Sequence, residues 1–212
     1  MRTIQSKMAL AAMACAVAAF GQYTAAPAGP PPVELSVGVR DALQKDGAKV
    51  TGPSGVVCEL WFLAAEPAGP KSTEDGVTLP MIPQGALLGA LRFPVKGLDR
   101  RGQTIKAGVY TLRYGNYPVN GDHQGVAPQR DFLVMTPAAD DTDAKATPTF
   151  EQLMIVSRKA SNTPHPAVLS FWKTDGDAKP GSIDKSGDTD WVLQMKLGQT
   201  AISIIVVGTA GS

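Results

Sequence analysis

Short apolar runs separated by turn residues constrain the fold of this chain more than any other feature of its sequence. After residue 32 these runs end repeatedly at Gly, Pro, Asp or Asn, the residues that commonly bound strands. The chain holds 22 Gly and 17 Pro, a composition that favours many turns and short strands over long helices. The candidate strands are residues 33–39, 56–63, 77–82, 86–93, 108–114, 131–136, 166–172, 190–197 and 201–207.

Residues 190–197 have the two-residue period of a strand in an antiparallel sheet. Alternate residues from Trp191 to Leu197 are apolar and those between them are mostly polar, as expected for one buried and one solvated face. Residues 198–200 can form a short hairpin loop into 201–207. That last segment is apolar on both faces, so we expect it to be a central strand.

Residues 148–159 are predicted to form a helix. Thr147 can cap its N-terminus, Pro148 suits the first helical position, and apolar residues follow at helical spacing. The alternative is a strand at 152–157, because Met-Ile-Val also suits a sheet. About nine strands and one short helix predict an all-β fold, a single antiparallel β-sandwich of the jelly-roll type over residues 33–212.

The N-terminus has the pattern of an export signal over residues 1–21. Basic residues precede an apolar run at 8–20, which suits the core of a signal peptide and is short for a membrane-spanning helix. Cleavage is expected before Gln22, with a cut near Ala26 as the alternative, and the mature protein is expected to be periplasmic or extracellular. No later apolar run reaches the roughly 18 residues of a membrane span, so no transmembrane segment is expected in the mature chain.

Residues 22–32 are rich in Pro, Ala and Gly, and we interpret them as an extended, mobile linker. Cys15 lies inside the signal; lipidation there is an alternative, although the residues before it lack the leucine that such sites usually carry. Removal of the signal leaves Cys58 alone, so no internal disulfide is expected. We interpret Cys58 as a buried strand residue, with pairing to another chain as the alternative.

The stretch 114–132 combines turn formers with residues that suit a binding site. His123, one of two histidines in the chain, lies within it, and His165 precedes another candidate strand. If the predicted helix returns the chain to the end of the sheet where this loop lies, both histidines enter strands from one end and lie close together. With Asp122 or Asp131 they would then form a site for zinc or copper.

Two other interpretations of this loop stay open. Tyr114, Tyr117 and Arg130 can present flat and forked polar surfaces to a glycan or a peptide, and long loops are often functional. Alternatively, the aspartates cap turns, Arg130 pairs with a carboxylate, and the histidines make ordinary loop hydrogen bonds. Tyr114 then belongs to the core, because it shares a strand face with Tyr110.

Acidic loops at 138–145 and 174–190 supply oxygen atoms that suit calcium, although lysines are interleaved and the ordered spacing of an EF-hand is absent. Catalysis has little support in the sequence, which contains neither a GxSxG nucleophile elbow nor a nucleotide-binding glycine loop. The formal net charge is +1 and no basic stripe is present, so nucleic acid is not an expected partner.

Residues 92–115 read RFPVKGLDRRGQTIKAGVYTLRYG and contain the segment AGVYTL at 107–112. This AGxYxL strand start after a polar loop resembles a pattern in uncharacterised exported bacterial β-sandwich domains. The resemblance covers roughly an eighth of the chain and implies a β-sandwich and an envelope location. It carries no activity and no functional residue across, and the later segments GDHQGVAPQRDF and HPAVLSFW lie outside the shared pattern.

These features predict a non-catalytic exported β-sandwich protein that binds a glycan, a peptide or an envelope protein through the loops 114–131 and 161–166. One alternative is a zinc- or copper-binding protein, or a metalloenzyme, that uses His123 and His165. Another is a structural envelope component without a small ligand. The distance between the histidines and the exposure of the tyrosines distinguish these possibilities.

Overall fold

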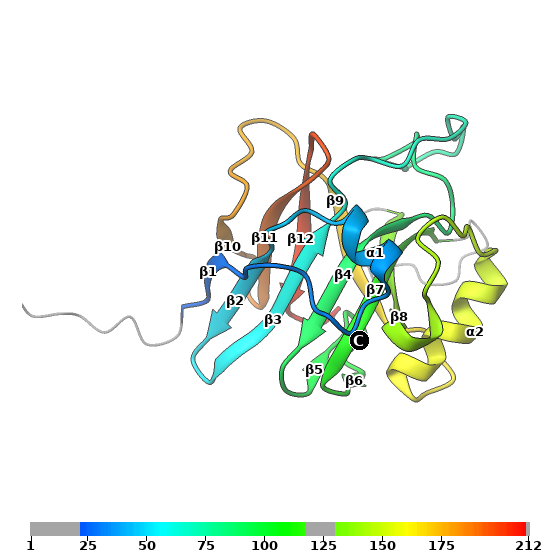
Figure 1. Ribbon diagram of the computed structural model, residues 1–212. Coiled ribbons are helices and arrows are strands. Elements are labelled where there is room, and N and C mark those ends of the chain that lie inside the picture. Colours follow the sequence, from blue (N-terminus) through cyan, green and yellow to red (C-terminus); the bar gives the residue numbers. More distant parts are fainter. Residues whose placement is uncertain (1–21, 118–129, 211–212) are drawn as a thin grey trace, which may run out of the picture.

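The protein is built around one large antiparallel sheet. The computed structural model describes residues 22–117 and 130–210. Within these residues ten strands form one sheet in the order β1-β2-β3-β4-β7-β8-β9-β12-β11-β10 (Figure 1). The all-β prediction is confirmed. From β1 to β9 the strands of the sheet lie side by side in sequence order, whereas β9-β12-β11-β10 has the antiparallel order of a Greek key.

The elements are short and are joined mostly by turns. The strands of the large sheet are β1 (Thr24–Pro27), β2 (Ala48–Gly52), β3 (Gly55–Phe62), β4 (Leu87–Phe93), β7 (Gly108–Asn116), β8 (Asp131–Pro137), β9 (Val168–Lys173), β10 (Ile183–Ser186), β11 (Asp190–Leu197) and β12 (Thr200–Val207). Between β4 and β7, a separate ribbon pairs β5 (Gly97–Leu98) with β6 (Thr104–Ile105). The helices are α1 (Val37–Ala42), α2 (Phe150–Ser161) and the single 3-10 turn η1 (Ala138–Asp140).

The sheet curls so that its two edges approach each other. Tyr23, directly before β1, packs against Trp191 of β11 with ring centroids 4.9 Å apart. Elsewhere Gly198, between β11 and β12, donates its backbone N–H to the carbonyl of Leu63, after β3, at 3.0 Å. These contacts hold the two arms of the sheet over each other, with one large hydrophobic core between them. In Figure 1 the arm with β10, β11 and β12 lies behind β2 and β3.

Strand β8 is buried on both faces because α2 covers its outer side. Leu133 and Met135 belong to the large core between the arms of the sheet. Phe132 and Val134 belong to a smaller cluster on the opposite face, which α2 completes. The two-residue period of a strand separates these two sets. The ladder between β7 and β8 and the packing of α2 on β8 therefore form a rigid support for the loops at the end of these strands.

Helix α1 belongs to a segment that crosses in front of the sheet before β2 (Figure 1). Leu35 and Val39, four residues apart, are buried in the core, whereas Val37 is exposed. Ser36 caps the helix, because its hydroxyl accepts the N–H of Val39 at 3.3 Å. The cap and the helical spacing of the buried residues explain why the strand predicted for 33–39 is wrong.

Residues 77–82 form an irregular loop instead of the predicted strand. The backbone N–H groups of Thr78 and Leu79 donate to the carboxylate of Asp131 and are thereby withdrawn from any strand ladder. Pro80 has no N–H to offer. The apolar composition of this segment reflects packing of the loop onto the core, in which Leu79 and Ile82 are buried.

Strand β1 lies within residues 22–32, which composition led us to interpret as a mobile linker. It pairs with β2 in antiparallel register, from Thr24 opposite Thr51 to Pro27 opposite Ala48. A ladder uses backbone groups only, so small side chains do not prevent it. A short strand that ends in proline is suited to the edge of a sheet, because its outer side needs no partner there.

Helix α2 confirms the predicted helix and places its start at Phe150. Thr149, not Thr147, is the cap: its hydroxyl accepts the N–H of Gln152 at 3.3 Å, and the side chain of Gln152 accepts the N–H of Thr149 at 2.9 Å. This reciprocal pair satisfies two backbone donors that a helix start leaves free. The C-terminal end has Asn162 in the left-handed conformation, with φ 54°.

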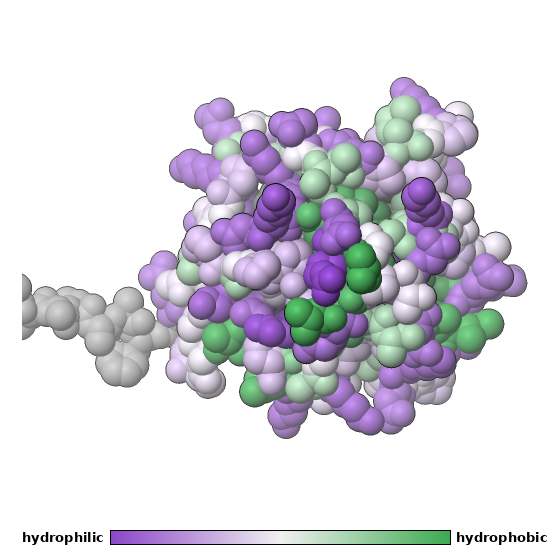
Figure 2. All heavy atoms as spheres, viewed as in Figure 1, coloured by the Kyte–Doolittle hydropathy of each residue, from purple (hydrophilic) through white to green (hydrophobic). Residues whose placement is uncertain are grey.

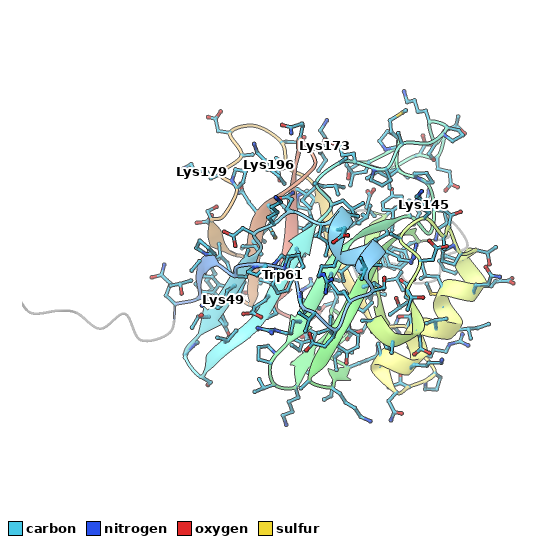
Figure 3. All side chains as sticks on the ribbon, in the orientation of Figure 1. Lys49, Trp61, Lys145, Lys173, Lys179 and Lys196 are labelled. Carbon is cyan, nitrogen blue, oxygen red and sulfur yellow. The ribbon has the colours of Figure 1, made fainter. Side chains whose placement is uncertain are left out.

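The visible surface is mostly polar, with small and separate apolar spots (Figure 2). The large apolar residues with most exposure come from different parts of the chain: Val33, Val37, Met81, Val95, Leu98 and Ile155. Figure 3 shows Trp61 within the fold, where it is buried, and labelled lysines that project from separate segments around it. Among the described residues, no helix combines the length and the apolar character that crossing a membrane requires.

Candidate ligand-binding site

The loop between β3 and β4, residues 63–86, packs over the end of the sheet at which β7 ends and β8 begins. Asp131, the first residue of β8, is fully buried and holds this loop. Its carboxylate accepts the N–H of Thr78 at 2.8 Å, the N–H of Leu79 at 3.3 Å and the hydroxyl of Tyr114 at 2.6 Å. A buried carboxylate is tolerated when donors of this kind satisfy it. Asp131 therefore fastens the loop to the two central strands.

Arg130 ties the same loop from its other side. Its guanidinium donates to the carbonyl of Tyr117 at 2.9 and 2.6 Å, to the carbonyl of Asp75 at 3.0 Å, and to the carboxylate of Glu74 at 2.5 Å. Gly76 adopts a φ of 74°, in the left-handed region that favours glycine, and this lets the chain turn beside Arg130. The ion pair is half exposed and stabilises little by itself, so the main effect of Arg130 is to position the loop.

A pocket of about 930 Å³ opens between this loop, the end of β7 and the start of α2. Its volume lies in the range of about 300–1,000 Å³ that is typical of small-molecule sites. One part of the wall is apolar and is formed by Pro70, Ile82, Pro83 and Phe150. The capping box of α2 fixes the position of Phe150, because that residue is the first of the helix. The pocket thus has rigid supports on two sides.

Gln84 and Asn116 place two unpartnered polar atoms at this pocket. The backbone N–H of Asn116 donates to Oε1 of Gln84 at 3.2 Å, which fixes the orientation of the Gln84 amide. Nε2 of Gln84 and Oδ1 of Asn116 are buried, and neither has a hydrogen-bond partner in the part of the chain that the structure describes. A buried polar group left without a partner costs about 1–3 kcal/mol. One donor and one acceptor therefore lie on neighbouring side chains with their hydrogen-bonding capacity unused.

The charged groups at the pocket leave it slightly acidic. Arg130 pairs with Glu74, so these two charges offset each other. Asp75 is exposed and adds a negative charge, which gives a sum of +1 − 2 = −1 for the three side chains. A site with this balance disfavours anions, because a like charge has to be desolvated beside it.

Both tyrosines that the sequence suggested as ligand contacts lie in the interior. Tyr114 has no exposed surface and meets Phe171 edge to face, with ring centroids 6.0 Å apart. Tyr117 is 8% exposed and stacks on Phe132, with centroids 4.3 Å apart. Burial raises the pKa of both phenols, and the hydrogen bond to Asp131 raises that of Tyr114 further. Tyr114 and Tyr117 thus support the site from beneath.

His165 lies at the end of the sheet opposite the pocket. Val134 pairs with Val168 in antiparallel register, so the residues before β9 lie beside the last residues of β8. We expected the helix to return the chain to the end that carries the loop, and this was wrong. Residues 138–149 make that return, since Phe150 already lines the pocket, and α2 then runs back. His165 consequently enters β9 from the far end.

The pairing of His123 with His165 stays a prediction, because Asp122 and His123 lie outside the described residues. His165 is exposed, and its backbone N–H donates to the hydroxyl of Thr163 at 3.0 Å. Over the residues that the structure describes, no group of three or more His, Cys, Asp or Glu side chains is arranged to hold a metal ion.

Several carboxylates of the acidic loops form ion pairs within the protein. Asp140 pairs with Lys159 at 2.6 Å, and Asp190 pairs with Arg100 at 2.7 Å. These contacts join the loops to α2 and to the turn after β5. They give Asp140 and Asp190 a structural role, and calcium binding by these loops stays a prediction.

A second pocket, of about 490 Å³, lies between α2 and the segment 138–149, beside a buried ion pair. Arg113 is 1% exposed and donates to the two carboxylate oxygens of Asp141, each at 2.6 Å. It also donates to the carbonyls of Gly85, Asp143 and Ala146. Burial raises the pKa of Asp141, but hydrogen bonds from Arg113 and Thr111 outweigh it and bring the pKa below its usual value. The pair is satisfied internally and holds the segment on the sheet.

Sequence reasoning found Arg130 and Asp131 and missed the loop that faces them. Gln84 is 32 residues from Asn116, and Glu74 is 56 residues from Arg130, so sequence proximity does not connect these partners. The available signal is the length and the Pro-, Gly- and Ser-containing composition of residues 63–86, because long loops of this kind are often functional.

Comparisons with known proteins give no further information about this site. The chain matches no protein-family model, no curated protein and no solved structure. The interpretation of the pocket therefore rests on its own geometry and chemistry.

Proposed function

We propose that this protein is a non-catalytic, exported binding protein that takes a small ligand into the pocket beneath residues 63–86. The observation that carries the proposal is the unpartnered Nε2 of Gln84 next to the unpartnered Oδ1 of Asn116 at one pocket. Both residues line the cavity, so a ligand that enters it lies beside these two amides. Phe150 and Ile82 contribute apolar contact beside them. This combination of a few polar groups in a largely apolar cleft is typical of ligand sites.

The proposed site shares Arg130 with the loop 114–131 that the sequence nominated. The sequence placed the site at Tyr114 and Tyr117, whereas the proposed pocket is lined mainly by residues 63–86. The segment 161–166 does not line it. The pocket supports binding over catalysis, because the groups that face it are amides, hydroxyls, the Arg130–Glu74 ion pair and the exposed carboxylate of Asp75. None of these is a nucleophile held beside a base.

Export is part of the proposal and rests on the sequence of residues 1–21, with further support from the resemblance of residues 92–115 to exported bacterial domains. Sequencing the N-terminus of protein recovered from the periplasm or the medium tests it. The expected first residue is Gln22. Recovery of the chain only in the cytoplasm, with Met1 retained, contradicts export.

Binding in the pocket is tested by nuclear magnetic resonance on ¹⁵N-labelled protein with a panel of small neutral fragments. Thr73→Trp places a large side chain at the exposed rim of the pocket and is expected to abolish the shifts that ligands cause at Gln84 and Asn116. Thr189→Trp makes the same change in an exposed turn away from the pocket and is the matched control. Equal binding by both variants contradicts the proposed site.

Metal content is measured on the same protein, purified without chelators, by elemental mass spectrometry. Near-stoichiometric zinc or copper that disappears in His123→Ala and in His165→Ala favours the metal-binding alternative. Binding of fragments at Gln84 without such a metal favours the proposal made here.

A further inference from the structure

The chemistry of the pocket restricts the class of ligand, provided that the proposed function holds. Gln84 offers an N–H donor and Asn116 a carbonyl acceptor, and the hydrogen bond between Asn116 N–H and Gln84 Oε1 at 3.2 Å keeps the two amides adjacent. A ligand that satisfies both needs an acceptor and a donor close together. Neighbouring hydroxyl groups on one ring meet this requirement, since each hydroxyl both donates and accepts.

We propose that the ligand is a neutral carbohydrate, with Gln84 and Asn116 as the residues that determine specificity. The net charge of −1 from Glu74, Asp75 and Arg130 disfavours uronic acids and phosphorylated sugars relative to neutral sugars. The apolar wall that includes Phe150 and Ile82 suits the C–H face of a sugar ring, whose hydroxyls then point along the ring edge toward the amides.

A peptide fits this position less well, although its backbone also carries a donor and an acceptor. Extended peptides commonly bind by adding a strand to the free edge of a sheet. The pocket lies at the end of β7 and β8, and both strands have neighbours on each side, β4 beside β7 and β9 beside β8. No strand edge is open there, so a peptide cannot add a strand at this position, whereas a single sugar ring needs no strand edge.

Titration of the full-length mature protein with defined probes tests the ligand class. The probes are glucose, galactose, mannose and N-acetylglucosamine with their disaccharides, glucuronic acid, a blocked dipeptide amide, and cyclohexanol as an apolar ring. Chemical shifts of the Gln84 and Asn116 side-chain amides report binding in the pocket. We expect at least one neutral sugar to bind ten-fold or more tightly than glucuronic acid.

Gln84→Leu keeps the size of the side chain and removes its hydrogen bonds, and Gln199→Leu makes the same change at an exposed hairpin. Sugar affinity is expected to fall about ten-fold or more in Gln84→Leu and to stay unchanged in Gln199→Leu, with cyclohexanol binding retained in both. Retained binding of cyclohexanol shows that the pocket of the variant is still folded.

Two kinds of result overturn the inference. If cyclohexanol or the dipeptide amide shifts the pocket amides and no neutral sugar does, the carbohydrate class is wrong while the proposed function stands. Sugar binding that is insensitive to Gln84→Leu, or equally tight for glucuronic acid, also refutes it. If no probe shifts these amides, both the inference and the proposed function fail.

Discussion

The hydroxyl of Tyr114 lies 2.6 Å from a carboxylate oxygen of Asp131, and neither residue has solvent-exposed surface. Tyr114 comes from the core of the sheet, and the same carboxylate holds the backbone of Thr78 and Leu79 in the loop over the pocket. The core and the pocket loop therefore share one hydrogen-bonded centre. A change in the core at this position is transmitted to the pocket wall through Asp131.

Tyr114→Phe is expected to lower the free energy of unfolding by about 1.5–3 kcal/mol, because a hydrogen bond to a charged group is lost and the carboxylate stays buried. Tyr110→Phe is the matched control. The hydroxyl of Tyr110 donates to the neutral carbonyl of Lys106 at 2.8 Å, so a loss of only about 1 kcal/mol is expected. Urea denaturation measures both values. Equal losses in the two variants contradict a special role for Asp131.

The same variant is expected to loosen the pocket loop. Hydrogen exchange at Thr78 and Leu79 is predicted to accelerate in Tyr114→Phe and to stay unchanged in Tyr110→Phe, because only the former changes a donor to Asp131.

The regular part of the fold was predictable because burial imposes a period on the sequence. In β11, Leu193 and Met195 are buried and the residues between and beside them are more exposed. The sequence predicted this alternation. β10 was missed because it is a short edge strand in which three of the four side chains are polar, and β2 was missed because it is short and places only Ala48 and Val50 in the core. In both, the apolar pattern is too short to predict a strand, although the backbone ladder forms one.

Arg113→Met is expected to destabilise the protein by about 3–5 kcal/mol, because it leaves Asp141 without its main partner in a mostly buried site. Lys159→Met is the control, since the Lys159–Asp140 pair is largely exposed and is worth about 0–1 kcal/mol. Thermal and urea unfolding give both values. A loss of less than 1 kcal/mol in Arg113→Met means that the segment 138–149 does not depend on this ion pair.

Asp141 makes the stability depend on pH in a defined direction. Its pKa is lower in the folded protein, because the hydrogen bonds and charge of Arg113 outweigh the effect of burial. The stability that Asp141 contributes is therefore fully present above the unfolded pKa of about 4 and is lost as the pH falls through the folded value. Asp99 acts oppositely: burial raises its pKa, so its contribution is present below the unfolded pKa and is lost as the pH rises.

Asp141→Asn is expected to reduce the stability at pH 7 and to flatten the loss of stability as the pH falls below about 4, the unfolded pKa, because the variant has no carboxyl group there to protonate. Urea denaturation over this range compares the two slopes. Parallel curves for the wild type and the variant would show that other carboxyl groups control the acid response.

Cys58 is expected to be unreactive in the folded protein. Its side chain is 1% exposed, and burial, with a smaller contribution from Glu59, raises the pKa of the thiol to about 12. Only the thiolate reacts with iodoacetamide, so labelling at pH 8 is expected to be at least 100-fold slower in the native protein than in 6 M guanidinium. Peptide mass spectrometry that follows the Cys58 peptide measures this ratio. Rapid labelling of the native protein would support an accessible cysteine that is able to pair with another chain.

The candidate site was only partly predictable because its residues meet through long-range contacts. Arg130 and Asp131 drew attention as a charged pair beside a strand, and both do hold the pocket. Gln84 carried no signal, since a single glutamine before a strand is ordinary. Its role depends on the pairing of β4 with β7, which brings it beside Asn116, and that pairing is a property of the whole sheet.

Hydrogen exchange is expected to show that β1 is an ordered strand. The N–H of Ala28 donates to the carbonyl of Gly47 at 2.9 Å, and the N–H of Gly29 donates to the carboxylate of Asp46 at 2.7 Å. Peptides over residues 24–29 are therefore predicted to exchange more slowly than those over the exposed loop 175–177. They should exchange faster than the central strand β4, since β1 lies at the sheet edge.

Tyr23→Ala tests whether contact between the two edges of the sheet holds β1 in place. The ring of Tyr23 packs against Trp191 at 4.9 Å, and aromatic pairs contribute about 0.5–1.5 kcal/mol beyond simple burial. Protection of residues 24–29 is thus expected to fall roughly three- to ten-fold, with no change in β7 and β8. Immediate exchange of this segment in the wild type would restore the linker interpretation, whereas unchanged protection in the variant would assign the order of β1 to its pairing with β2 alone.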